Sequence, residues 1–362
     1  MEYYKNIIKR RKTKSVSIGN IKVGSNAPIT VQSMTNTLTS NLFSTMDQIK
    51  ALEEAGADLV RVSCPDEKST KALKTLVEKT KVPLIADIHF HSKRAIEAAE
   101  AGAACLRINP GNIGNEEKVK NVIDAAKSNN CAIRIGVNAG SLEKELIDKY
   151  YRATPQAMLE SALKHINILE KYNFFNTKVS VKASNVALAI DSYRLLAKST
   201  DYPLHLGITE AGSLVGGTVK SSIGIGGLLS EGIGDTIRVS LSENPTDEVK
   251  VGIEILKALG IRKSGLDIIS CPSCARQQFN VIETVKIIEK KYAGIKKHIT
   301  LSILGCVVNG PGEAKHVDIG ITGGGNNNHQ IYVNGEKSFV SKNQNLTEVI
   351  SDLIEKKLKN EI

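Results

Sequence analysis

The sequence contains no tryptophan, and aromatic residues make up only 4% of its 362 residues. It also has no long apolar run, because its longest uncharged stretch, residues 23–46, is rich in serine, threonine and asparagine and could not lie in lipid. No apolar segment of the kind found in secretory signals follows the basic first 14 residues. We therefore expect a cytoplasmic protein with no membrane partner.

Cysteine is also scarce. Six cysteines in a chain of this length are too few for a disulfide scaffold, which favours a reducing compartment and thiols kept for chemistry. What the chain has in excess is positive charge, with 48 Lys and Arg against 38 Asp and Glu. The net charge of +10 suggests an anionic partner, without saying whether it is nucleic acid, a membrane surface or a small phosphate ester.

Eight short β-rich runs recur along the first two thirds of the chain. They lie at residues 28–32, 58–63, 82–87, 104–109, 132–137, 178–182, 203–207 and 236–241. Most are apolar on both faces, as in parallel strands covered on both sides, and amphipathic helical stretches separate them. Eight such repeats predict an α/β protein with a (β/α)8 TIM barrel. A doubly wound sheet is the alternative, but no GxGxxG motif follows the first strand.

The pattern changes after residue 262. The following residues carry a CPSC motif, a long helix at 278–292, strands at 299–304, 317–322 and 330–333, and a helix at 346–360. This mixed order predicts a smaller α+β domain. We therefore expect a substrate-binding barrel over residues 1–262 and a metal-binding domain over 263–362.

Cationic residues stand at the ends of five barrel strands, where TIM barrels place their active sites. They are Arg61, Arg107, Arg134, Lys182 and Arg238. Cations are costly in a barrel core unless an anion pairs with them, and arginine forks match phosphate oxygens. Any one arginine could form a structural ion pair, but the five together favour phosphate or diphosphate binding. Aromatic residues for base stacking are scarce at these strand ends, which argues against nucleic acid.

Three titratable residues at the strand ends are candidates for acid–base chemistry, namely Asp87, His89 and Glu210. A metal role for His89 is weak, because no HxH or HExxH partner accompanies it. Lys182 could be read as the Schiff-base lysine of an aldolase. The surrounding cations favour a phosphate contact instead.

Three cysteines fall within or beside the barrel strands, and we interpret them as packing residues: Cys64, Cys105 and Cys131. The other three lie in the second domain. Cys271 and Cys274 form the CPSC motif, and Cys306 follows 32 residues later in GCVVNGPGEA. Two metal sites are open: zinc held by the three cysteines and one histidine or glutamate, with His316 as a candidate, or an iron–sulfur cluster held by three thiolates. Three thiolates instead of four leave a coordination position free, which favours chemistry at the metal.

Ten sequence motifs in order along nearly the whole chain resemble one family. They are VQSMTNT, VRVSCP, ADIHF, LRINPGNIG, IRIGVNAGSL, SVKASN, LGITEAG, SEGIGDTIRVSL, SCPSCAR and LGCVVNGPGEA. They are similar to motifs of the two-domain bacterial 4-hydroxy-3-methylbut-2-enyl diphosphate synthases. The resemblance implies a TIM barrel joined to a [4Fe–4S] domain related to sulfite-reductase modules. It implies an iron–sulfur oxidoreductase of the non-mevalonate isoprenoid pathway that reductively opens 2-C-methyl-D-erythritol 2,4-cyclodiphosphate.

The resemblance also implies roles for single residues. The implied cluster ligands are Cys271, Cys274, Cys306 and Glu313. The implied diphosphate ligands are Arg61, Arg107, Arg134, Asn138, Lys182 and Ser240. Glu210 is the implied catalytic carboxylate, with Asp87 and His89 as further candidates. The implied partners are reduced flavodoxin or ferredoxin and a second subunit, in a homodimer whose active site both subunits share. The alternative function is a dihydropteroate-synthase-like phosphate-binding barrel with a structural zinc-ribbon domain.

Overall fold

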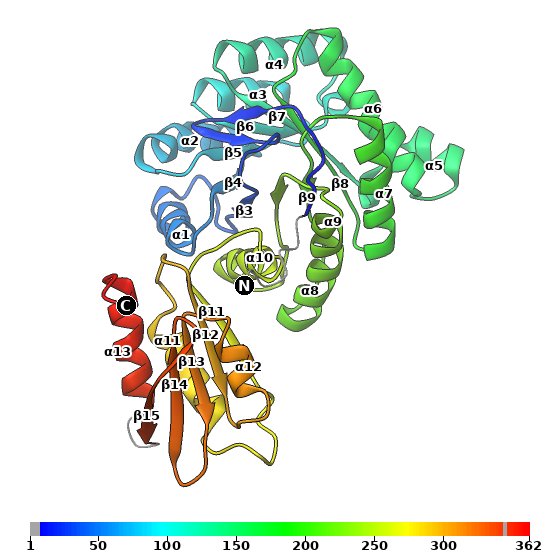
Figure 1. Ribbon diagram of the computed structural model, residues 1–362. Helices are drawn as coiled ribbons and strands as arrows, with labels where there is room; N and C mark the ends of the chain where they lie inside the picture. The colour runs from blue at the N-terminus through cyan, green and yellow to red at the C-terminus, as the bar shows by residue number, and fades with distance from the viewer. Residues whose placement is uncertain (1–7, 343–345) are drawn as a thin grey trace. The chain divides into compact units, whose positions relative to one another are not determined.

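The computed structural model describes residues 8–342 and 346–362 (Figure 1). The chain divides into two compact units, the first ending at Leu259 and the second beginning at Gly260. No helix in the described ranges is long and apolar enough to cross a membrane.

The first unit is built around eight parallel strands. They are β3 (Thr30–Met34), β4 (Leu59–Ser63), β5 (Leu84–Asp87), β6 (Cys105–Ile108), β7 (Ala132–Asn138), β8 (Thr177–Lys182), β9 (His205–Leu206) and β10 (Thr236–Ile237). Their order is β8-β7-β6-β5-β4-β3-β10-β9, and a parallel bridge between Val179 and Leu204 joins the two ends of this sheet. The sheet is thereby a closed barrel, which confirms the predicted TIM-barrel fold (Figure 1).

Helices separate the strands and cover the outside of the barrel (Figure 1). They are α1 (Leu42–Glu54), α2 (Glu67–Lys79), α3 (Ser92–Glu100), α4 (Glu116–Ser128), α5 (Lys144–Tyr150), α6 (Pro155–Lys171), α7 (Val186–Ser199), α8 (Leu214–Ser221), α9 (Gly227–Ser230) and α10 (Pro245–Ala258). Side-chain caps set several of their starts, because Asp66, Asn115 and Asn185 each accept a backbone N–H of the first helical turn. The caps at Asp66 and Asn185 lie three residues after the ends of β4 and β8, so the loops before α2 and α7 are short.

A hairpin that the sequence pattern did not predict precedes the barrel. Strands β1 (Val16–Ile18) and β2 (Ile21–Val23) pair antiparallel. Their buried residues Val16, Ile18 and Val23 pack with residues at the start of the barrel strands, such as Leu59 and Ile85. The hairpin therefore covers the end of the barrel at which its strands begin.

The second unit contains a five-stranded sheet. Its strands β11 (Leu266–Ser270), β12 (Ile299–Leu304), β13 (Ile319–Gly323), β14 (Asn328–Val333) and β15 (Glu336–Lys342) lie in sequence order. The first three are parallel and the last two antiparallel. Helices α11 (Val281–Lys291) and α13 (Leu346–Leu358) contribute their apolar faces to the core on one side of the sheet.

The short helix α12 (Gly310–Ala314) packs on the opposite face of β12 and β13. Ile319 and Ile321 of β13 belong to the core beneath α11 and α13, so Gly320 and Thr322 face the other way. A Cβ on Gly320 would lie 2.6 Å from the Cβ of Ala314, and this close approach requires glycine. The sheet therefore holds α12 tightly at the loop that follows β12.

Candidate active site

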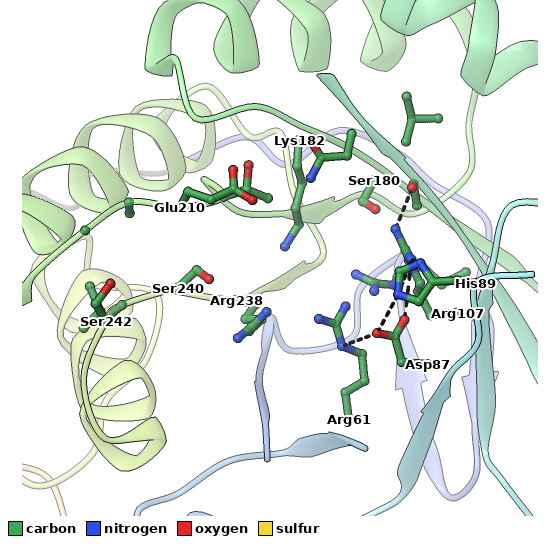
Figure 2. A pocket seen from close by; sticks show the side chains of 18 residues that line it. Arg61, Asp87, His89, Arg107, Ser180, Lys182, Glu210, Arg238, Ser240 and Ser242 are labelled. Carbon is green, nitrogen blue, oxygen red and sulfur yellow. Dashed lines mark hydrogen bonds and ion pairs between the residues drawn. The ribbon is translucent and has the colours of Figure 1, made fainter. Parts of the chain in front are cut away.

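The strand ends of the barrel surround a cavity of about 370 Å³ (Figure 2). Every barrel residue that the sequence analysis assigned to substrate or catalysis lines it: Arg61, Asp87, His89, Arg107, Arg134, Asn138, Lys182, Glu210 and Ser240. The barrel thus brings together side chains that lie up to 179 positions apart, from Arg61 to Ser240.

Asp87 is the centre of one side of the cavity, and Figure 2 shows Arg61, His89 and Arg107 gathered around it. Its carboxylate lies 3.9 Å from Arg61 Nε, 3.6 Å from Arg107 Nη1 and 3.5 Å from His89 Nε2. Burial alone would raise the pKa of Asp87, but Arg61, the His89 hydrogen bond and Arg107 hold that pKa well below its usual range. Asp87 is therefore a carboxylate that orients its neighbours, and it is a poor proton donor while they remain charged.

Two glycines make room for the cations. A Cβ on Gly136 would lie 2.5 Å from Arg107 Nε, and a Cβ on Gly207 would lie 2.4 Å from Lys182 Nζ. The carbonyl of Gly136 also accepts a 3.0 Å hydrogen bond from Arg107 Nη2. Any larger residue at either position would displace the cation from the cavity wall.

The cavity also includes Arg238. The sequence analysis counted it among the strand-end cations, but the family resemblance did not include it among the implied diphosphate ligands. Arg238 lies two residues before Ser240, and both side chains line the cavity. Its Nη2 is 3.4 Å from both oxygens of Glu248, which is 4% exposed on α10. The same carboxylate accepts hydrogen bonds from the Leu241 N–H at 3.0 Å and from the Ser33 hydroxyl at 3.2 Å. No local pattern could have revealed Glu248, because its partners lie on other elements.

Two other cations have no such support. Within the described residues, neither Arg134 nor Lys182 has a side-chain hydrogen bond or an ion pair, and they are 1% and 8% exposed. Burial, followed by neighbouring cations, lowers the pKa of both side chains. The cavity wall carries five Lys and Arg against two carboxylates, and Glu248 behind Arg238 is a third, which leaves a formal excess of two positive charges. A buried excess of this kind is the expected wall of a site for a small polyanion.

Glu210 lies at the mouth of the cavity with a backbone φ of +47°. This left-handed conformation is unfavourable for a residue with a Cβ and is concentrated at functional sites. Its side chain is exposed, unlike that of Asp87. Figure 2 shows Glu210 near Lys182, apart from the group around Asp87. Of the two carboxylates on the wall, Glu210 is the one placed to exchange a proton with solvent.

The second unit brings two of its three cysteines, Cys271 and Cys306, to the same end of the sheet, and Cys274 follows Cys271 by three residues. Cys271 directly follows β11 and Cys306 lies two residues beyond β12, and these parallel strands pair with Ser270 opposite Ile303. The Gly305 N–H donates to Cys271 Sγ at 3.3 Å. All three thiols are free. Hydrogen bonding from the Val308 N–H, followed by Arg276, lowers the pKa of Cys306, so its thiolate is favoured.

The described residues contain no group of three or more histidine, cysteine or acidic side chains close enough to hold a metal ion. The four implied cluster ligands therefore do not approach one another closely enough in this structure to form a metal site. Cys271 and Cys274 follow β11, Cys306 follows β12, and Glu313 lies on α12. The three barrel cysteines, Cys64, Cys105 and Cys131, are fully or almost fully buried, in agreement with a packing role.

Fold and site together define a class, namely a TIM-barrel protein with a polycationic mouth and a second unit that carries free thiols at one end of its sheet. Residues 13–253 match the GcpE TIM-barrel domain and residues 267–356 match the GcpE protein C-terminal domain. The chain belongs to the GcpE family, which confirms the resemblance carried by its motifs.

Characterised relatives agree with this assignment. The chain is 58% identical over 355 residues to the 4-hydroxy-3-methylbut-2-en-1-yl diphosphate synthase (flavodoxin) of Rhodospirillum rubrum, covering 97% of this chain and 92% of the relative. It is also 58% identical to the protein of the same name from Zymomonas mobilis, covering 97% and 93%. Among solved structures, a dihydropteroate synthase from Xanthomonas albilineans covers 69% of this chain and 98% of its own, at 14% identity and a TM-score of 0.48. Similarity at this TM-score and identity carries no argument for the alternative function, a dihydropteroate-synthase-like barrel.

Proposed function

We propose that this protein is an enzyme that reductively opens 2-C-methyl-D-erythritol 2,4-cyclodiphosphate and releases 4-hydroxy-3-methylbut-2-enyl diphosphate in the non-mevalonate isoprenoid pathway. The observation that carries the proposal is the cavity with a formal excess of two positive charges, in which Arg134 and Lys182 have no protein partner within the described residues. A cyclic diphosphate with two negative charges supplies the missing counter-charge. The reaction consumes two electrons and two protons and releases one water.

The barrel residues bind and orient the substrate. Arg134 and Lys182 face the diphosphate without competition from a protein carboxylate, whereas Arg61 and Arg107 are held by Asp87. When the tertiary C–O bond breaks, the phosphate oxygen that leaves gains negative charge. Cations already in place stabilise that charge without reorganising.

Glu210 is the proposed proton donor to the hydroxyl that leaves as water. Its exposure lets it recover a proton from solvent between turnovers. His89, also exposed on the cavity rim, is 3.1 Å from Arg107 through Nδ1 and positions that guanidinium. Asp87 remains ionised and holds His89 and Arg107 in position.

The second unit is proposed to hold a [4Fe–4S] cluster through Cys271, Cys274, Cys306 and Glu313. The donor set fits this group, because two of the three free thiols lie at one end of the sheet, Cys306 favours its thiolate, and backbone N–H groups point at sulfur. Such a cluster would supply the two electrons one at a time. The barrel over residues 1–262 and the cluster domain over 263–362 then divide substrate binding from electron supply.

Flavodoxin is the proposed electron donor, because it is named in the relatives' activity, and ferredoxin is the alternative. We propose a homodimer in the cytoplasm in which both subunits contribute to each active site. Mixing two inactive variants, Lys182→Ala and Cys306→Ser, tests this arrangement. In an equimolar mixture with free subunit exchange, about half of the dimers are mixed and each has one intact shared site, so about a quarter of the wild-type activity should be recovered, and no recovery would contradict a shared site.

The function itself is tested by anaerobic reconstitution with iron and sulfide. We expect a brown protein with about four irons per chain that converts the cyclodiphosphate when reduced flavodoxin is added, with product measured by mass spectrometry. Cys306→Ser should lose both colour and turnover, whereas the matched core variant Cys131→Ser should keep both. A colourless protein with one zinc per chain that does not convert the cyclodiphosphate would refute the proposal.

A further inference from the structure

The register of the barrel strands aligns four charged residues in one row. Asp87 of β5 pairs with Arg107 of β6, Arg107 with Arg134 of β7, and Arg134 with Lys178 of β8. Paired residues of neighbouring strands lie about 4.8 Å apart with side chains on the same face. Arg134 lines the cavity, so Lys178 also points into the barrel. The row therefore continues beyond the cavity wall to a fourth residue to which no role has been given.

Lys178 is buried more deeply than the cations above it. It is 0% exposed and does not line the cavity, whereas Lys182, four residues further along the same strand, does. Its Nζ has no hydrogen-bond partner within the described residues. An ammonium group with no acceptor in a closed barrel is one of the most costly arrangements in a protein.

The surroundings of Lys178 make its charge still less favourable. The titratable groups that act on it are Arg134 from β7, Arg61 from β4 and Cys105 from β6. His205 of β9 lies within electrostatic range and is also fully buried. No carboxylate is among the groups that shift its pKa, and burial raises the pKa of the Cys105 thiol. Burial first, then Arg134 and Arg61, lower the pKa of Lys178 to about 7, although the Cys105 contribution opposes them.

An anion in the cavity reverses this balance. It would neutralise Arg134, the direct neighbour of Lys178, and add a negative charge above the row. We propose that Lys178 belongs to the charge network behind the diphosphate site, that it is uncharged in a fraction of the empty protein that grows as the pH rises, and that it takes up a proton from solvent when the diphosphate binds. This inference depends on the proposed function, because the diphosphate is its ligand.

The ligand makes the coupling measurable. Each phosphorus of a cyclic diphosphate carries one strongly acidic group, so the ligand itself does not titrate between about pH 6 and about pH 9. Any proton taken up on binding therefore belongs to the protein. Linkage requires affinity to fall up to about tenfold for each pH unit above the pKa of the empty site if one proton is taken up.

The experiment is isothermal titration calorimetry with the cyclodiphosphate and the oxidised, reconstituted enzyme, without reductant so that no turnover occurs. Two buffers of different ionisation enthalpy at the same pH report the number of protons taken up, and the affinity is then followed as the pH rises. We expect proton uptake by the wild type. Lys178→Met should lose this uptake and bind more weakly at low pH, yet match the wild type at high pH, where Lys178 is neutral in both states. Lys74→Met, at an exposed position on α2, is the control and should behave as the wild type.

The outcomes separate the two proposals. Absence of binding at any pH would refute the proposed function. Binding by the wild type without proton uptake, or uptake retained in Lys178→Met, would overturn the role of Lys178 alone, and the second result would assign the proton to Lys182 or His89. If circular dichroism shows that Lys178→Met is not folded, Lys178→Gln replaces it, and buffer-independent binding heats of the wild type would still overturn the inference.

Discussion

Glu248 supports the wall of the cavity, and removing its carboxylate should affect both stability and ligand affinity. It is 4% exposed and accepts from Arg238 and the Leu241 N–H, which follow β10, and from the Ser33 hydroxyl of β3. Glu248→Ala leaves the Leu241 N–H without an acceptor and the partly buried Arg238 without its counter-charge, whereas the Ser33 hydroxyl can still donate to the Pro245 carbonyl. Glu248→Gln keeps one amide oxygen for the Leu241 N–H but removes the charge.

The expected magnitudes follow from these contacts. Removing one partner of a buried ion pair costs about 3–5 kcal/mol, so Glu248→Ala should destabilise the barrel by about 4 kcal/mol. The glutamine variant leaves fewer groups unsatisfied and should cost about 2 kcal/mol. Both variants should bind the cyclodiphosphate more weakly, because Arg238 is no longer held at the cavity wall.

Because the chain has two units, a global unfolding signal would mix two transitions. The appropriate assay is the urea dependence of hydrogen exchange in peptides from β3 and β10, which reports the opening of the barrel alone. Glu243→Ala, which removes an exposed carboxylate two residues before the same helix, is the matched control and should change stability by less than about 0.5 kcal/mol. An effect of Glu248→Ala no larger than that of the control would refute the argument that this carboxylate supports the wall.

Other predictions concern the cavity and the loops beside it. Gly136→Ala should weaken cyclodiphosphate binding at least about tenfold, measured by calorimetry, because the new Cβ would displace the Arg107 guanidinium. Gly216→Ala on α8, where a Cβ meets no atom within 4 Å, should leave affinity unchanged, and equal effects of the two would contradict the steric argument. Burial alone would raise the pKa of Glu143, but hydrogen bonds from the buried His165 and other donors lower it from its ordinary 4.5 to about 2. Its contribution to stability is therefore present above pH 4.5 and lost as the pH falls towards 2. Between pH 4.5 and pH 2, the urea midpoint of Glu143→Gln should fall less steeply with decreasing pH than that of the wild type. Parallel curves for the two proteins would contradict this assignment.

The sequence alone determined the barrel strands closely. Runs predicted at 58–63 and 132–137 lie within two residues of the observed strands, because a strand buried on both faces must be apolar at every position and this signal is local. The same local signal also marked the strand-end cations, because charge is conspicuous in an otherwise apolar run. Hence every barrel residue assigned from the sequence to substrate binding or catalysis lines the cavity.

Short or exposed elements carried no such signal. The β1–β2 hairpin has only three residues in each strand, and β15 is mostly exposed and carries lysine and glutamate. These strands form because a neighbouring surface or strand already exists, so their residues need no strong pattern of their own.

Only the tertiary structure decided which charges have partners. From the sequence, Lys178 is merely the first residue of a predicted strand, and Glu248 is one of several acidic residues on an amphipathic helix. Closure of the barrel removes Lys178 from water and aligns it with Arg134, and it brings Glu248 within reach of Arg238 and Ser33. Composition and pattern thus establish that the chain is basic and where its cations fall along the strands. Whether each positive charge is neutralised, exposed or left for a ligand depends on contacts between distant segments, which folding alone creates.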